Sequence, residues 1–206
     1  MTLLAAAQLS AQTAPAGTVA IDAAAGSSLT IRGSTTIGAR WHCTSAEITS
    51  TVTLSVEPSG DGEPPLTTVR GVTIRVPVSG LRCQSGPMER AMRHAMRADQ
   101  DSASTVIMGR FAAHVSSVVH PTEVSGAHLD GTLTVAGVER PVVLVASIQP
   151  QPDCSILVRS SLPLTLSTFA ISPPSLLFGT VRARDEITIE VDLRYSKPDQ
   201  LPPNRE

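Results

Sequence analysis

Histidines are the side chains of this chain best suited to acid–base or metal chemistry, and their spacing assembles neither. The five stand at positions 42, 94, 114, 120 and 128, without an HExxH or HxH spacing that would place two rings on one metal. His94 lies between arginines on the wet side of a predicted helix, and His42 adjoins Trp41 and Cys43 in a predicted strand. We therefore predict no catalytic histidine and no metal site.

Nucleophile and phosphate-binding motifs are also missing from the sequence. The chain contains no GxSxG elbow, no P-loop and no GxGxxG. Glu186, Glu190 and Asp192 alternate along a predicted strand, which is typical of a solvated face, and Asp61 and Glu63 fall in a loop rich in glycine and proline. The sequence accordingly predicts a protein that is not an enzyme and that uses no cofactor.

Three cysteines, Cys43, Cys83 and Cys154, leave at least one thiol without a partner. They form no CxxC pair and no zinc-type spacing. An exported chain would form one disulfide, whereas a cytosolic chain would keep three thiols. Cys154 follows Pro152 and Asp153 at a predicted hairpin tip, where it is either a reactive or dimer-forming thiol or an incidental residue, so the oligomeric state stays open.

Composition predicts one domain with an aliphatic core. The 206 residues are 41% hydrophobic, yet aromatic residues make up only 2%. The net charge of −2 and the lack of a basic stripe with interleaved aromatics argue against nucleic acid as a partner. No apolar run reaches the roughly 18 residues of a membrane-spanning helix.

The two ends of the chain differ from its middle. Residues 1–14 contain a short apolar run and a small-residue site, and we interpret them as a residual signal peptide, with a disordered alanine-rich N-terminus as the alternative. Residues 15–195 form the predicted domain, and residues 196–206 are a polar, proline-rich tail that we expect to be disordered.

Alternation of apolar and polar residues predicts an all-β fold. The clearest strand is 186–195, where five apolar residues alternate with five polar ones. Other predicted strands are 28–32, 48–56, 72–78, 104–119, 126–136, 141–149, 155–160 and 162–169. Their spacing is typical of a sandwich or barrel.

Two local signals are more specific. In residues 131–144, Gly137 is free to take the positive φ of a tight turn, and Pro141 begins the returning strand, which predicts a hairpin. Residues 87–98 predict one amphipathic helix, with Ser85 as N-cap and Met88, Met92 and Met96 on one face. We expect this helix to plug or flank the barrel.

Four segments in this order resemble the YceI-like family of extracytoplasmic, lipocalin-like barrels. They are SSLTIRGSTTIGARWHC (27–43), VTIRVPVSGLRCQSGPMERAMRHAM (72–96), GTLTVAGVERPVVL (131–144) and LPLTLSTFAISPPSLLFGTVRARDEITIEVDLRY (162–195). The resemblance implies a single antiparallel up-and-down β-barrel of about eight strands with one helix, in the periplasm or secreted. Within the family, the chain resembles a branch with a cysteine pair and a Met-bearing helix, and this resemblance implies a Cys43–Cys83 disulfide. The Arg-Asp-x-His-Leu-Arg segment of better-known members is absent.

The resemblance further implies a lumen that binds a polyisoprenoid or an isoprenoid-quinone-like lipid, which the protein carries or sequesters. A barrel lined by aliphatic side chains suits such a tail, because burial contributes about 0.8 kcal/mol per CH₂. Strand parity and the helix predict as lining residues Ile48, Val52, Leu54, Val72, Ile74, Val76, Met88, Met92, Phe111, Leu133, Val135, Leu164, Leu166, Phe169, Ile187 and Ile189. The alternative is a structural or stress-associated interaction barrel with a filled core and no ligand.

Overall fold

Antiparallel strands account for most of the chain in the computed structural model, which describes residues 17–57, 66–98, 106–118, 123–153, 155–176 and 179–196. The predictions for residues 1–14, for Cys154 and for the tail after residue 196 lie outside the described residues. The strands are β1 (Gly17–Asp22), β2 (Ser28–Thr35), β3 (Arg40–Ser45), β4 (Thr49–Glu57), β5 (Leu66–Pro77), β6 (Arg82–Cys83), β7 (Val106–Val118), β8 (Ser125–Val135), β9 (Val138–Pro150), β10 (Ile156–Thr165), β11 (Ser175–Leu176) and β12 (Val181–Tyr195).

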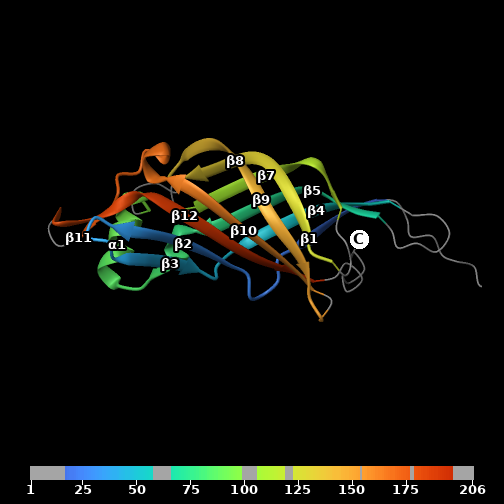
Figure 1. Cartoon of the computed structure of the whole chain (residues 1–206), viewed down its shortest axis with the longest axis horizontal. Helices are drawn as coiled ribbons and strands as arrows, with labels where there is room; N and C mark the ends of the chain where they lie inside the picture. Colours follow the sequence, from blue (N-terminus) through green and yellow to red (C-terminus); the bar gives the residue numbers. More distant parts are fainter. Residues whose placement is uncertain are drawn as a thin grey trace, which may run out of the picture.

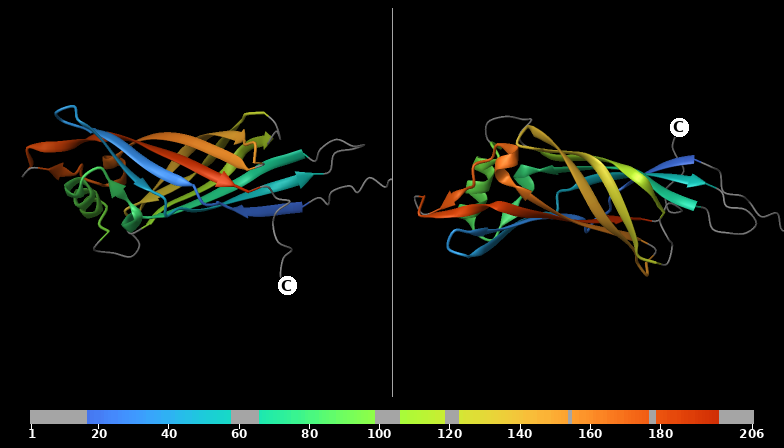
Figure 2. Two further views of the ribbon diagram at one scale, coloured as in Figure 1. Left: turned by 90° about the horizontal axis from the view of Figure 1, so that it is seen from below. Right: turned by 45° about the horizontal axis from the view of Figure 1, so that its top comes forward.

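These strands form one curled sheet, a half-barrel with one helix (Figures 1 and 2). Neighbouring strands follow the order β1-β4-β5-β7-β8-β9-β10-β12-β2-β3-β6, and β11 pairs with β12. The predicted fold class, antiparallel all-β with one helix, is confirmed. The described residues contain twelve strands rather than about eight. The strands that the alternation did not predict are β1, β3, β6 and β11, which have six residues or fewer and therefore show no clear period.

The sheet does not follow a simple up-and-down order throughout. β7 to β10 are joined by successive neighbouring pairs, whereas β2 pairs with β12 and β1 pairs with β4. At the end of the sheet away from the helix, the segment between β1 and β2 contacts both β4 and β12. There Ala23 donates to the Ser50 carbonyl over 2.7 Å and forms an isolated bridge with Tyr195.

The hairpin between β8 and β9 has the predicted turn. Val135 pairs with Val138, and the two residues between them, Ala136 and Gly137, have φ of 50° and 78°. Positive φ at both central positions defines the type I′ turn that suits the twist of a two-residue hairpin. The predicted strands 155–160 and 162–169 are instead one strand, β10, followed by the 3₁₀ helix η3 (Leu166–Phe169).

The one α-helix of the described residues, α1 (Gly86–Ala95), lies at one end of the curled sheet beside β11 (Figure 1). Ser85 is the N-cap, because its side chain accepts a hydrogen bond from the Met88 amide over 3.4 Å, and a proline occupies the first turn. Met88, Met92 and Met96 are buried in the core. The predicted helix and its apolar face are thus confirmed, with α1 ending slightly earlier than expected.

Candidate functional site

The interior of the half-barrel is the candidate site, because the inward-facing residues of every long strand meet there. The alternation of β12 illustrates this: Ile187, Ile189, Val191 and Leu193 are buried, whereas the residues between them are partly exposed. Strands β2, β5, β8 and β9 contribute aliphatic side chains to the same cluster. A continuous apolar core therefore fills the space that the sheet encloses.

A small cavity lies within this core. Its volume is about 30 Å³, which is far below that of an ordinary ligand pocket. The cavity is lined by Leu29, Ile74, Ile107, Gly109, Phe111, Leu133, Leu144, Leu162, Ile189 and Val191. Since none of these residues has a polar side chain, the cavity offers dispersion contacts and no side-chain hydrogen bond.

The predicted lining residues are distributed over the core in three groups. Ile74, Phe111, Leu133 and Ile189 line the cavity itself. Buried elsewhere in the core are Val52, Leu54, Val72, Val76, Met88, Met92, Val135, Leu166, Phe169 and Ile187. Ile48 and Leu164 are only partly buried against the core.

Sequence reasoning missed six of the residues that line the cavity. Leu162 and Val191 lie two positions from the predicted Leu164 and Ile189, so strand parity could have found both. Leu144 belongs to an aliphatic run in which both strand faces are apolar, which hides the parity. Gly109 carries no hydrophobic signal at all, although its backbone lies at the cavity wall.

At the α1 end, the core is closed by the helix and by a disulfide. Cys43 and Cys83 are directly paired across β3 and β6, and they form the disulfide that the family resemblance implied. The Glu89 carboxylate accepts hydrogen bonds from the Cys83 amide over 3.1 Å and from Arg93 over 2.7 Å. These contacts fix α1 to the short strand β6, which is attached to the sheet by two residue pairs.

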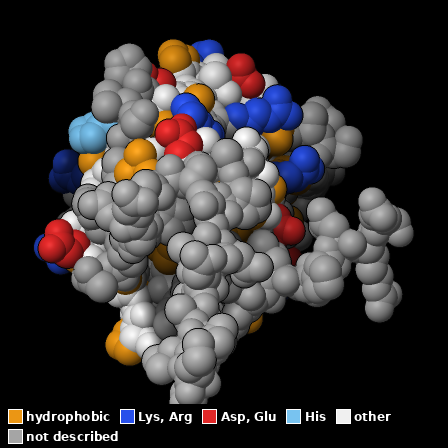
Figure 3. All heavy atoms as spheres, turned by 90° about the vertical axis from the view of Figure 1, so that its right-hand side faces the viewer, with side chains coloured by type: hydrophobic (Ala, Val, Ile, Leu, Met, Phe, Trp, Pro, Cys, Tyr) orange, Lys and Arg blue, Asp and Glu red, His pale blue; other side chains and the backbone are white. Residues whose placement is uncertain are grey.

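At the opposite end, the core is closed by a polar pair. The hydroxyl groups of Ser50 and Tyr195 are 2.7 Å apart, and both residues are buried. Burial raises the pKa of Tyr195 to about 12, although the hydrogen bond with Ser50 acts in the opposite direction. Figure 3 views the molecule from this end, where basic and acidic side chains are interspersed over the described surface.

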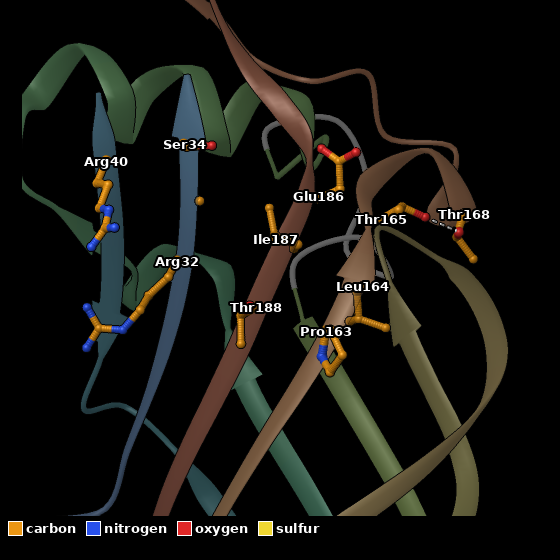
Figure 4. A pocket seen from close by; sticks show the side chains of 11 residues that line it. Arg32, Ser34, Arg40, Pro163, Leu164, Thr165, Thr168, Glu186, Ile187 and Thr188 are labelled. Atoms are coloured by element: carbon orange, nitrogen blue, oxygen red, sulfur yellow. Dashed lines mark hydrogen bonds between the residues drawn. The ribbon is translucent and has the colours of Figure 1, made fainter. Parts of the chain in front are cut away.

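A second hollow lies on the outer face of the same strands. It is an open groove of about 750 Å³ between β2, β10 and β12, and its walls include Arg32, Arg40, Thr165, Thr188 and Glu186 (Figure 4). The Arg32 Nε atom donates to the Glu190 carboxylate over 2.6 Å. Pro163, Leu164 and Ile187 also line this groove. Because the groove is open to water, it shields an apolar ligand less than the interior does.

The predicted chemistry-bearing residues are scattered in the described structure. His94 and His128 are exposed, and His42 is partly buried on β3. Among the described residues, no group of three or more histidine, cysteine, aspartate or glutamate side chains is arranged to hold a metal ion. In the same residues, no helix is long and apolar enough to cross a membrane.

The curled antiparallel sheet, its aliphatic interior and its single helix define a small lipocalin-like barrel. The family model of the YceI-like domain matches residues 20–195, and the chain belongs to this family. None of the curated proteins matches it in sequence.

Two solved structures have the same fold. BcnA from Burkholderia cenocepacia has a TM-score of 0.56 and 11% identity, over 81% of this chain and 95% of that one. A polyisoprenoid binding domain from Saccharophagus degradans has a TM-score of 0.62 and 11% identity, over 87% of this chain and 98% of that one. At this identity the likeness shows a shared fold.

Proposed function

We propose that this protein binds one long apolar lipid, a polyisoprenoid or an isoprenoid-quinone-like molecule, inside the half-barrel, and carries or sequesters it. The observation that carries the proposal is the cavity lined only by nonpolar groups at the centre of an aliphatic core. The solved polyisoprenoid binding domain with the same fold adds support. The proposed role involves no catalytic step and no partner other than an apolar molecule.

The physical basis of binding is the transfer of the tail out of water. Each buried CH₂ contributes about 0.8 kcal/mol, and a prenyl tail requires no hydrogen bonds from the wall. Ligand sites usually have volumes of about 300–1,000 Å³. The cavity of about 30 Å³ must therefore widen roughly tenfold when the tail enters.

The α1 end is where the core has most freedom to widen. Met88, Met92 and Met96 present unbranched thioether side chains, which repack around irregular shapes more readily than branched ones. The helix is attached through the two-residue strand β6 rather than through a long ladder. Displacing its methionine face breaks few backbone hydrogen bonds, whereas widening the middle of the sheet breaks many.

We also propose an extracytoplasmic location, in the periplasm or outside the cell. The Cys43–Cys83 disulfide supports it, since disulfides persist in oxidising compartments and are rare in the cytosol. A lipid carrier in such a compartment would protect an apolar tail from water between membranes.

A filled barrel that acts through its surface is the second candidate. The small volume of the cavity favours it, and so do Val143 and Val145 on the outer face of β9, which are 56% and 52% exposed. Exposed apolar groups on a strand are a common feature of interaction surfaces. The two candidates differ in whether the purified protein holds a lipid.

Native mass spectrometry of protein purified from a bacterial host, followed by organic extraction, tests the proposal. We expect one prenyl-lipid adduct per chain, and a protein mass two hydrogens below that of the reduced chain because of the disulfide. A lipid-free mass, with no uptake of added solanesol, would overturn the carrier function and favour the filled barrel.

A matched pair of variants on β9 locates the lipid. Leu144 lines the cavity, whereas its neighbour Val143 faces outward. Leu144→Phe overfills the interior and should abolish the adduct, while Val143→Phe should retain it. Thermal unfolding of both variants confirms that they are folded, since overpacking costs about 1–3 kcal/mol.

A further inference from the structure

Phe111 is the only aromatic residue among those that line the cavity, and two glycines make room for it. Phe111 on β7 is directly paired with Gly131 on β8, and Gly109 lies two residues before it on the same strand face. All three positions face the interior, because they share parity with the buried Ile107 and Leu133. The sheet wall therefore has two neighbouring positions without side chains, and the Phe111 ring lies over them.

The fit is close on both edges of the ring. A methyl group at Gly109 would lie 2.5 Å from Cε2 and 3.1 Å from Cζ of Phe111. A methyl group at Gly131 would lie 2.7 Å from Cδ1 on the other edge of the ring. Each of these distances is shorter than the ordinary carbon–carbon contact of about 3.5–4.0 Å. The two glycines thus form a recess that holds the ring against the wall.

Backbone conformation does not explain these glycines. Neither Gly109 nor Gly131 is among the residues with positive φ, and both lie inside regular ladders. Glycine in a strand interior weakens the strand and often marks a close approach by another group. At Gly109 the approaching group is the Phe111 ring, whereas a methyl at Gly131 would meet the Arg110 carbonyl oxygen and the Phe111 Cα as well as the ring.

We propose that Phe111 determines which apolar tails the interior accepts, and that Gly109 and Gly131 position its ring. This inference rests on the proposed lipid binding. The Phe111 ring occupies space at the cavity wall that a tail would otherwise fill. The recess keeps the ring out of the centre of the cavity. Removing the ring enlarges the space for a tail, whereas filling the recess pushes the ring into the tail's path.

Gly109→Ala is the most selective way to fill the recess. The three atoms nearest to the added methyl all belong to the Phe111 side chain, whereas a methyl at Gly131 would also meet the backbone of Arg110 and Phe111. The ring must therefore move into the cavity while the sheet is preserved. Gly109→Ala in combination with Phe111→Ala removes the clash and serves as the rescue variant.

The experiment measures binding of farnesol, geranylgeraniol and solanesol by the wild type and by these variants. For Phe111→Ala we expect a preference shifted toward solanesol, and for Gly109→Ala about tenfold weaker binding of every probe, because a misplaced methylene in an apolar pocket changes binding at least that much. The double variant should regain the affinity that Gly109→Ala loses.

Trp41→Ala is the matched control, because Trp41 is a buried aromatic residue on β3 that does not line the cavity. It should lower stability without changing the preference for tail length. Phe111→Leu, a milder change, gives the same readout if Phe111→Ala does not fold. A wild type that binds none of the probes would overturn both the lipid-binding function and this inference. Probe binding by the wild type with an unchanged length preference in the Phe111 variants would overturn the inference alone.

Discussion

The inner and outer faces of β2, β10 and β12 each border a hollow, and the two hollows differ in volume, in access to water and in the charge of their lining residues. Leu162 and Ile189 line the inner cavity of about 30 Å³, whereas their neighbours Pro163 and Thr188 line the outer groove of about 750 Å³. The larger hollow is open and is bordered by charged, polar and apolar side chains, while the smaller lies in the core and has only apolar side chains in its lining. Volume in the resting structure is thus a poor guide to an apolar site, and desolvation is a better one.

Substitution of adjacent residues on β12 should show the largest difference between the faces. Ile189→Ala leaves a hole in the core and should lower the free energy of unfolding by about 3 kcal/mol. Thr188→Ala removes a groove side chain that water reaches and should change it by less than about 0.5 kcal/mol. Urea unfolding measures both values. Similar losses in the two variants would mean that the groove face contributes to the core.

Titration of Tyr195 tests how well the inner face excludes water. Its pKa of about 12 lies above the ordinary value of about 10 because the hydroxyl is buried. Below pH of about 10 the tyrosine is neutral in both folded and unfolded chains, so its contribution to stability is fully present. Between that pH and about 12 only the unfolded chain ionises, and the free energy of unfolding should fall by on the order of 3 kcal/mol.

The composition makes this measurement simple. Tyr195 is the only tyrosine, so tyrosinate absorbance reports this one hydroxyl. Tyr195→Phe should remove the loss of stability at high pH, at the expense of leaving the Ser50 hydroxyl without its partner. An ordinary tyrosine pKa in the folded protein would mean that this end of the barrel is open to water.

The ion pair beside the outer groove should have the smallest effect. Arg32 and Glu190 are linked over 2.6 Å, but their side chains are 54% and 40% exposed. Exposed pairs of this kind contribute at most about 1 kcal/mol and are screened by salt. A double-mutant cycle with Arg32→Gln and Glu190→Gln should give a coupling energy below that value, which disappears at high salt. A larger, salt-independent coupling would show that the groove is less solvated than its geometry indicates.

Glycine has one role under the aromatic rings of the interior and another in the β8–β9 turn. Gly33 lies under the Trp41 ring, as Gly131 lies beside Phe111, and in both cases the aromatic residue and the glycine are a cross-strand pair. Gly137, by contrast, provides the positive φ of a turn. The turn glycine is recognisable from its neighbours in the sequence, whereas the other two are recognisable only once the pairing of strands is known.

The amino-acid sequence by itself determined the features that depend on near neighbours. The alternation of β12, the β8–β9 turn and the Ser85-capped helix follow from periods of a few residues, and the order of motifs identified the family and the Cys43–Cys83 pair. Only the tertiary structure decided that β12 pairs with β2, that β1 pairs with β4, and that the cavity is small. Parity tells which face of a strand is buried, but the volume that remains inside depends on how side chains from strands distant in sequence pack together. The same reason explains why the full recess of Phe111 cannot be read from the sequence: Gly109 precedes Phe111 on β7, but Gly131 lies next to the ring only because β7 and β8 pair in this register.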